Sequence, residues 1–204
     1  MNWSQNITAI NFLLKSLLAY DSLGNKIETD KAFFLWTRQS YKIRKNSNTI
    51  FLVGNGASAS MASHMAADLA NNAYVNTQVF TDISLMTAIA NDVGYEYVFS
   101  TPLSQCMQKG DMLIAISSSG NSPNIIQAVK KTTLLGGTTI TLSAMQKNNA
   151  LSSLGDINFY LPAKTYGLAE SCHAAILHFW ADHIIEAVTK ENDCAAQMQT
   201  KKRA

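Results

Sequence analysis

The stretch Ala115–Asn124, AISSSGNSPN, places four serines and one glycine at the end of an apolar run. The run DMLIAI is typical of a buried strand, and Pro123 fits the first turn of a helix, where its missing N–H costs nothing. Free backbone N–H groups and the helix dipole attract an anion at such a turn, and serine hydroxyls can donate to phosphate oxygens. The segment therefore predicts a phosphate site; the alternative is a polar loop with Ser122 as an N-cap.

A second glycine-bearing turn, GNGASAS over residues 54–60, also follows an apolar run. It departs from the dinucleotide pattern G-x-G-x-x-G, because Ala57 and Ser60 stand where further glycines are sought. We therefore expect no nucleotide cofactor. Asn55 and Ser58 could bind a sugar or carbonyl oxygen, or they could satisfy only the backbone of the turn.

The four histidines fall in two predicted helices. His64 and Asp68 are four residues apart and so share one helical face. Glu170 and His178 belong to a later helix, and their spacing does not say whether the two helices meet. If they meet, two imidazoles and two carboxylates form a set able to bind a divalent metal such as zinc or to move protons. The alternative is that each is a packed or surface residue.

These candidate residues need a scaffold, and the chain alternates apolar runs with helical patterns. An apolar stripe predicts a helix over residues 3–20, and a second helix is expected from about Asp30 to Lys45. Five apolar runs follow in order: NTIFLVG, NTQVF, DMLIAI, TTITLSA and INFYLPA. Their alternation with helices predicts an α/β fold, a three-layer αβα sandwich with a five-stranded parallel sheet. Ligands in such folds bind at the carboxyl ends of the strands, where both glycine turns fall.

The bulk composition narrows the class of protein. The chain has 204 residues, of which 47% are hydrophobic and 15% charged, whereas soluble domains average about 25% charged residues. This favours an oligomer, although a large core in a monomer gives a similar balance. A net charge of +2 provides no basic field for nucleic acid. The sequence predicts no signal peptide and no membrane span, and three unpaired cysteines favour a reducing compartment, so we expect the cytoplasm.

Four segments together resemble a sugar isomerase (SIS) domain, and most closely the phosphoheptose isomerases: GNGAS…SHMAAD, ANDVGYEYVFS, ISSSGNSPN and AESCHAAILHFW. That family usually has G-N-G-G-S, H-x-x-x-E, S-T-S-G-N-S and Q-E-x-H, then a final histidine. The match keeps this order and covers roughly residues 1–190. It implies one SIS domain with N-terminal helices over residues 1–190. The sequence after Glu191 is polar, so we expect a frayed tail over residues 191–204.

The resemblance also implies a function. It indicates an enzyme that isomerises an aldose–ketose pair of phosphosugars through an enediolate, most closely sedoheptulose 7-phosphate to a heptose 7-phosphate. It further implies a homotetramer with shared active sites, one zinc ion at each, and a sugar destined for a bacterial surface polysaccharide. Neither nucleic acid nor a membrane is an expected partner.

Particular residues receive roles from the same resemblance. Those expected to bind substrate are Asn55, Gly56, Ser58, Asp92, Ser117, Ser118, Ser119, Ser122 and Glu170. Those expected in catalysis are Asp68, His178 and Glu170. The expected zinc ligands are His64, Asp68, Glu170 and His178.

Three departures from the family pattern bear on the substrate. Asp68 replaces the family's catalytic glutamate, which shortens the side chain by roughly 1.5 Å. Glu170 stands where the family has glutamine, and Ala57 replaces a glycine. Because a misplacement near 1 Å can cost on the order of 100-fold in rate, two alternatives stay open. One is a non-catalytic SIS protein that binds a phosphosugar or a replication initiator, and the other is a phosphosugar lyase or etherase on the same fold.

Overall fold

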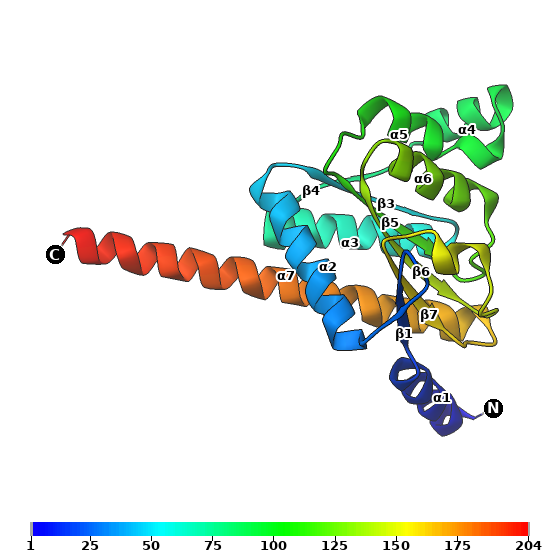
Figure 1. The fold of residues 1–204 in the computed structure, drawn as a ribbon, viewed down its shortest axis with the longest axis horizontal. Helices are drawn as coiled ribbons and strands as arrows, with labels where there is room; N and C mark the ends of the chain where they lie inside the picture. Colours follow the sequence, from blue (N-terminus) through cyan, green and yellow to red (C-terminus); the bar gives the residue numbers. More distant parts are fainter. Residues whose placement is uncertain (1, 204) are drawn as a thin grey trace.

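A computed structural model describes the backbone of residues 2–203 and the side chains of residues 2–194 (Figure 1). The strands are β1 (Leu18–Asp21), β2 (Lys26–Ile27), β3 (Thr49–Gly54), β4 (Asn76–Val79), β5 (Met112–Ser117), β6 (Thr138–Ala144) and β7 (Ile157–Leu161). The helices are α1 (Trp3–Lys15), α2 (Thr29–Lys45), α3 (Ala57–Ala73), α4 (Ile83–Asp92), α5 (Ser100–Cys106), α6 (Pro123–Leu134) and α7 (Tyr166–Arg203). Two short 3-10 helices, η1 (Tyr95–Tyr97) and η2 (Ala150–Ser153), lie in connections.

One sheet contains all seven strands in the order β2-β1-β7-β6-β5-β3-β4. The five strands from β4 to β7 in this order are parallel, as predicted. The predicted count of five was wrong for the whole sheet, because β1 pairs antiparallel with β7 and β2 pairs antiparallel with β1. The predicted helix over residues 3–20 was too long for the same reason: α1 ends at Lys15 and the chain turns into β1.

Helices cover both faces of the sheet, which confirms the three-layer α/β architecture. On one face, α1, α2, α3 and α7 bury a large apolar cluster against the sheet. On the other, α4, α5 and α6 enclose a second cluster. Every residue of β5 is buried because the strand lies at the centre with both faces covered. This arrangement gathers the carboxyl ends of β3 and β5 at one edge of the sheet, where polar side chains follow the strands.

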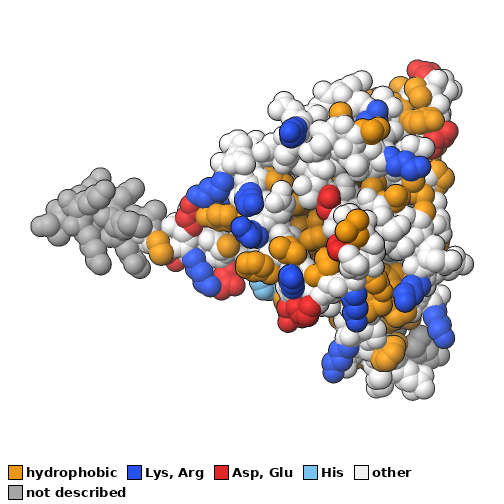
Figure 2. All heavy atoms as spheres, in the orientation of Figure 1, with side chains coloured by type: hydrophobic (Ala, Val, Ile, Leu, Met, Phe, Trp, Pro, Cys, Tyr) orange, Lys and Arg blue, Asp and Glu red, His pale blue; other side chains and the backbone are white. Residues whose placement is uncertain are grey.

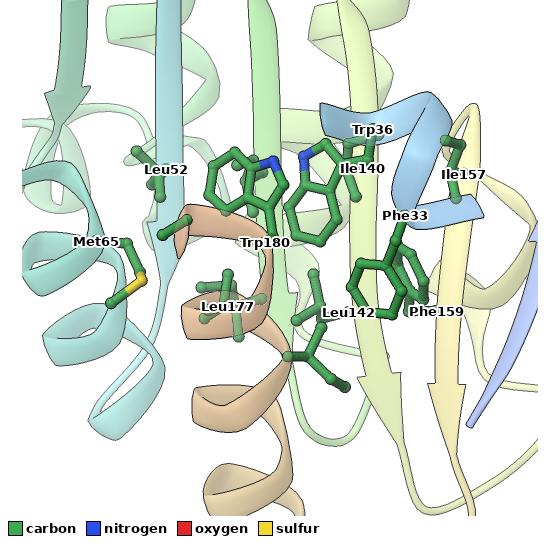
Figure 3. Close-up of a cluster of buried hydrophobic side chains, with 14 of the residues drawn as sticks. Phe33, Trp36, Leu52, Met65, Ile140, Leu142, Ile157, Phe159, Leu177 and Trp180 are labelled. Atoms are coloured by element: carbon green, nitrogen blue, oxygen red, sulfur yellow. The ribbon is translucent and has the colours of Figure 1, made fainter. Parts of the chain in front are cut away.

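Two tryptophans form the centre of the larger cluster (Figure 3). Trp36 of α2 and Trp180 of α7 are fully buried, and their rings stack with centroids 4.3 Å apart. The ring of Phe159 on β7 packs against Trp36 with centroids 5.4 Å apart. These aromatic contacts join two helices to the sheet and fix α7 along its middle.

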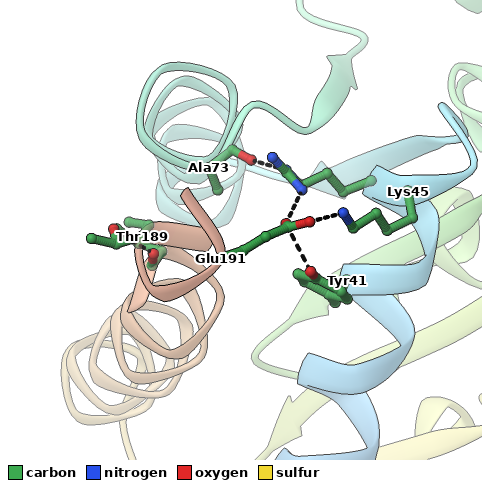
Figure 4. A network of polar contacts seen from close by, with 7 residues as sticks. Tyr41, Lys45, Ala73, Thr189 and Glu191 are labelled. Atoms are coloured by element: carbon green, nitrogen blue, oxygen red, sulfur yellow. Dashed lines mark hydrogen bonds and ion pairs between the residues drawn. The ribbon is translucent and has the colours of Figure 1, made fainter. Parts of the chain in front are cut away.

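The carboxylate of Glu191 on α7 contacts three side chains of α2, at a three-helix junction that Arg44 extends to α3 (Figure 4). It accepts hydrogen bonds from the Tyr41 hydroxyl at 2.7 Å and from the Arg44 guanidinium at 2.9 Å, and it pairs with Lys45. The same guanidinium donates to the carbonyl oxygen of Ala73 at the end of α3. The backbone of α7 continues beyond Glu191 to Arg203. Most of the frayed tail expected over residues 191–204 lies outside the residues whose side chains the structure describes, which end at residue 194.

Replacing Glu191 by glutamine is expected to lower the free energy of unfolding by about 1 kcal/mol, because the partly buried carboxylate loses its charge between two cations. Urea unfolding at low and high salt measures this, and the loss is expected to shrink at high salt, which screens charge pairs. The matched control is Glu186→Gln, since the ion pair of Glu186 with Lys190 is exposed and should contribute little. Equal effects of the two substitutions would contradict the assigned role.

The surface in Figure 2 shows lysine and arginine side chains interspersed with acidic and apolar ones. Several large apolar side chains are exposed, among them Phe12, Phe34 and Phe179. An apolar groove of about 320 Å³ lies between α1, α2 and α7 and is lined in part by Leu14, Phe33 and Phe179. Among the described residues, none of the helices combines the length and apolarity required to cross a bilayer.

Candidate active site

A polar cavity of about 170 Å³ lies at the carboxyl ends of β3 and β5. Its lining residues are Asn55, Ser58, Ile116, Ser117, Ser118, Ser119, Ser122, Tyr166 and Glu170. Seven of these nine were expected to bind substrate, and the structure brings those seven together. Neighbouring parallel strands end at the same edge of the sheet, so the two glycine turns that follow them form opposite walls.

Hydrogen bonds within the serine turn after β5 fix its shape. Gly120 adopts a φ of +65°, a conformation that favours glycine, and its N–H donates to the Ser117 carbonyl oxygen at 3.0 Å. The hydroxyl oxygens of Ser117 and Ser122 lie 3.2 Å apart. Within the described part of the chain, the buried Ser118 hydroxyl has no hydrogen-bond partner. A buried hydroxyl with no partner on the wall of a polar cavity is a group that an anionic ligand could satisfy.

The two walls are locked together by a pair of amides. Asn55 and Asn124 exchange hydrogen bonds of 3.0 and 2.8 Å between their side chains, and Asn124 is fully buried in the first turn of α6. The hydroxyl of Tyr95 also donates to Asn55 Oδ1, at 3.2 Å. Most of the hydrogen-bonding capacity of Asn55 is therefore used within the protein. Its principal role in this geometry is to fix the relative position of the turns.

A second group of chemically active side chains lies where α3 packs alongside α7. His64 Nε2 is 3.4 Å from Asp68 Oδ2, and the rings of His64 and His178 lie edge to face with centroids 5.3 Å apart. One potential ligand atom from each residue lies within 4.8 Å of those of the other two. The group is open to solvent, with the His64 side chain 58% exposed.

This trio meets the chemical requirements of a metal site. Two imidazoles and one carboxylate are a ligand set that zinc takes in catalytic centres, where a fourth position stays open for water or substrate. The donor atoms of His64, Asp68 and His178 are close enough to converge on one ion. Glu170 is not in this group and lines the serine cavity instead. Within one chain the structure thus brings together three of the four expected zinc ligands.

The separation of Glu170 from His178 follows from helical geometry. Both residues lie on α7, eight positions apart, which corresponds to about 12 Å along a helix axis. Glu170 sits in the first turns of α7 beside the cavity, while His178 lies farther along beside α3. The two residues therefore belong to different groups of side chains, at two levels of the same helix.

Two other expected substrate residues do not line the cavity. Asp92, the last residue of α4, is exposed, and its carboxylate accepts a hydrogen bond from the neighbouring Asn91 side chain at 2.8 Å. Gly56 is the N-cap of α3 with a φ of +55°, and it shapes the turn after β3. A Cβ atom on Gly54 would lie 2.5 Å from the Ser58 backbone, so this turn also depends on the glycine that precedes it.

Three residues near the cavity were missed by sequence reasoning: Tyr95, Asn124 and Tyr166. Tyr95 and Asn124 fall inside motifs recognised by their other residues, and only their pairing with Asn55 shows what they do. Tyr166 begins α7 and lines the cavity.

His173, one turn after Glu170, is fully buried, and burial lowers the pKa of its imidazole to about 4, so the ring is neutral at pH 7.

The fold and this pair of sites define the class of the protein. Residues 38–144, more than half of the chain, match the family model of the SIS domain. A phosphoheptose isomerase of Aliarcobacter butzleri is 35% identical over 178 residues, covering 81% of this chain and 92% of the relative. The chain therefore belongs to the phosphoheptose isomerase family of SIS domain proteins.

Other similarities agree with this assignment. A phosphoheptose isomerase of Helicobacter hepaticus is 37% identical over 154 residues, covering 72% of this chain and 78% of the relative. The structure of a phosphoheptose isomerase from Neisseria gonorrhoeae superposes with a TM-score of 0.77 at 26% identity, over 89% of this chain and 94% of the other. The resemblance inferred from the motifs is confirmed.

Proposed function

We propose that the protein is a phosphosugar isomerase that converts sedoheptulose 7-phosphate to a heptose 7-phosphate through an enediolate. The observation that carries this proposal is the serine-lined cavity at the strand ends, with an unpartnered hydroxyl and a carboxylate on its walls. The names of relatives at 35% and 37% identity, both phosphoheptose isomerases, support a phosphorylated seven-carbon sugar as the substrate. The serine turn would hold the phosphate, with its negative charge favoured by the N-terminus of α6.

The reaction moves protons between two neighbouring carbons. A carboxylate, Asp68 or Glu170, removes a proton from the carbon beside the carbonyl, and the C–H electron pair forms the double bond of the enediolate. His178, or a zinc ion that His178 would help to bind, stabilises the negative charge that develops on the carbonyl oxygen. A proton then passes from the neighbouring hydroxyl to the former carbonyl oxygen, and the carboxyl group returns its proton to the former carbonyl carbon, which completes the aldose. No atom is gained or lost, so the isomerisation needs no redox cofactor.

We also propose that His64, Asp68 and His178 hold a zinc ion, in line with their ligand types and their mutual distances. A zinc ion bound there would act as a Lewis acid toward the carbonyl oxygen. Glu170 completes the set only if it comes from another subunit, because in its own chain it belongs to the serine cavity.

A homotetramer with active sites shared between subunits is part of the same proposal. Exposed large apolar side chains, such as Phe34 at 63% and Phe179 at 43%, and the low charged fraction of 15% support subunit contacts. The exposed trio around His64 would then face the serine cavity of a neighbour. We place the enzyme in the cytoplasm, where it would supply a sugar for a bacterial surface polysaccharide.

The test is turnover of sedoheptulose 7-phosphate by the purified protein in heavy water, with and without added zinc. We expect a heptose 7-phosphate that carries deuterium on the former carbonyl carbon, because the proton held by the carboxyl group exchanges with solvent before it is returned. Chelation of metal is expected to lower the rate, and zinc to restore it. A bound phosphosugar with no turnover under any condition would instead favour a non-catalytic binding protein. Release of a fragment from the substrate would favour a lyase or etherase.

A further inference from the structure

The serine turn rests against the connection between β6 and β7, and Asn149 lies at the centre of this contact. Asn149 is 3% exposed and caps η2, its Oδ1 accepting from the Ser152 N–H at 3.1 Å. Its Nδ2 donates to the Gln146 carbonyl oxygen at 2.7 Å and to Ser143 Oγ at 3.2 Å. All the polar atoms of this side chain are therefore engaged, which fixes its position.

The Asn149 side chain packs directly on the backbone of Gly120. A Cβ atom on Gly120 would overlap the Asn149 amide, so no larger residue fits while Asn149 keeps its place. Two hydrogen bonds reinforce the contact. The Leu151 N–H donates to the Gly120 carbonyl oxygen at 3.0 Å, and the Ala150 N–H donates to Asn121 Oδ1 at 3.0 Å.

The end of β6 completes this support. The Ala144 N–H donates to the Ser118 carbonyl oxygen at 3.1 Å, and Ser143 Oγ accepts from Asn149. Hydrogen bonds on the side away from the cavity thus fix the serine turn at Ser118, Gly120 and Asn121. None of the supporting residues lines the cavity, so they would act on a ligand only through the shape of the turn.

We propose that Asn149 is a positioning residue for the serine turn, and that it sets the affinity of the cavity for a phosphate group. This inference rests on the proposed function, which assigns the phosphate to that turn. With Asn149 holding the start of η2 in place, the hydrogen bonds from Ala150 and Leu151 fix the backbone around Gly120, and the neighbouring hydroxyls keep one arrangement. Without it, the turn gains freedom that a phosphate must remove on binding, which lowers affinity.

The test compares the full chain with Asn149→Ala and with Asn148→Ala, using inorganic phosphate as the probe in calorimetry. Asn148 is the adjacent residue of the same connection and is exposed, so it is a matched control. We expect Asn149→Ala to weaken phosphate binding roughly tenfold, the equivalent of one well-made hydrogen bond, and Asn148→Ala to leave it unchanged. In turnover, KM should rise with the phosphate Kd, while kcat should change much less.

Asn149→Ser separates the positioning role from stability. Serine is a good N-cap, so it can preserve the start of η2, but it is too short to reach Gln146 or to press on Gly120. We expect Asn149→Ser to fold with a Tm near that of the unchanged protein and still to bind phosphate more weakly. If both variants bind phosphate as tightly as the unchanged protein, the role assigned to Asn149 is overturned and the proposed function stands. If the unchanged protein binds no phosphate, the proposed phosphate site is overturned and this inference with it.

Discussion

Replacing Asp68 by asparagine is expected to lower kcat for the isomerisation about 10²–10⁴-fold, the range that a positioned acid or base contributes. Asparagine has the shape of aspartate but cannot accept the proton that the sugar gives up. It would also weaken the contact with His64, whose Nε2 is 3.4 Å from the carboxylate. The measurement is steady-state kinetics, together with deuterium uptake from solvent, which reports the proton-transfer step directly.

Glu170→Gln decides which carboxylate is the base. This substitution introduces the residue that the family usually has. Because glutamine and glutamate have nearly the same shape, the serine cavity keeps its size. If Asp68 is the base, Glu170→Gln should retain much of the activity, whereas a loss of deuterium uptake in Glu170→Gln alone would transfer the role to Glu170. The matched control is Asp193→Asn, an exposed aspartate near the far end of α7, where no effect on kcat is expected.

Trp180→Ala is expected to lower the free energy of unfolding by about 3–5 kcal/mol, the usual cost of removing a buried aromatic ring. Trp180 is fully buried, stacks on Trp36 at 4.3 Å, and donates its Nε1–H to Ser40 Oγ at 3.2 Å. Its loss leaves a cavity between α2, α7 and the sheet. Urea unfolding measures the change, which should appear as a lower midpoint with an unchanged slope.

Trp3→Ala serves as the control for that substitution. Trp3 is 76% exposed at the start of α1, and truncation of an exposed side chain usually changes stability by less than about 0.5 kcal/mol. Similar losses in both variants would show that Trp3 is covered in solution, as a subunit contact would require. A small loss for Trp180→Ala would contradict the packing described for the core.

The repeating pattern of the parallel strands was predictable because each strand is an apolar run followed by a helical pattern, so sequence and fold agree locally. β1 and β2 were not predicted, because β1 directly follows the apolar stripe of α1 and β2 has only two residues. β1 pairs with β7, far along the chain, and β2 pairs with β1. The end of α1 was missed with them, because Leu17 and Leu18 continue its apolar stripe while belonging to the next segment.

The residues of the candidate site likewise fall into those that the sequence predicts and those that depend on contacts between distant segments. The serine cluster was predictable from the sequence, because the strand, the glycine turn and the helix N-terminus that form it are contiguous in the chain. Asn149 carries no comparable pattern, because its role depends on contact with Gly120, a residue that precedes it by 29 positions. Whether His64 would meet His178 was likewise undetermined, since nothing in either helix specifies that α3 packs on α7.

The continuity of α7 constrains how sequences of this kind can vary. The helix carries Glu170 at the serine cavity, His178 in the histidine and aspartate trio, Trp180 in the core and Glu191 at the three-helix junction. One residue inserted between Glu170 and His178 would turn everything beyond it by about 100° and advance it by about 1.5 Å. A substitution in that interval acts at one position, whereas a change in its length would displace His178 relative to Glu170 and shift Trp180 and Glu191 relative to their partners at the same time.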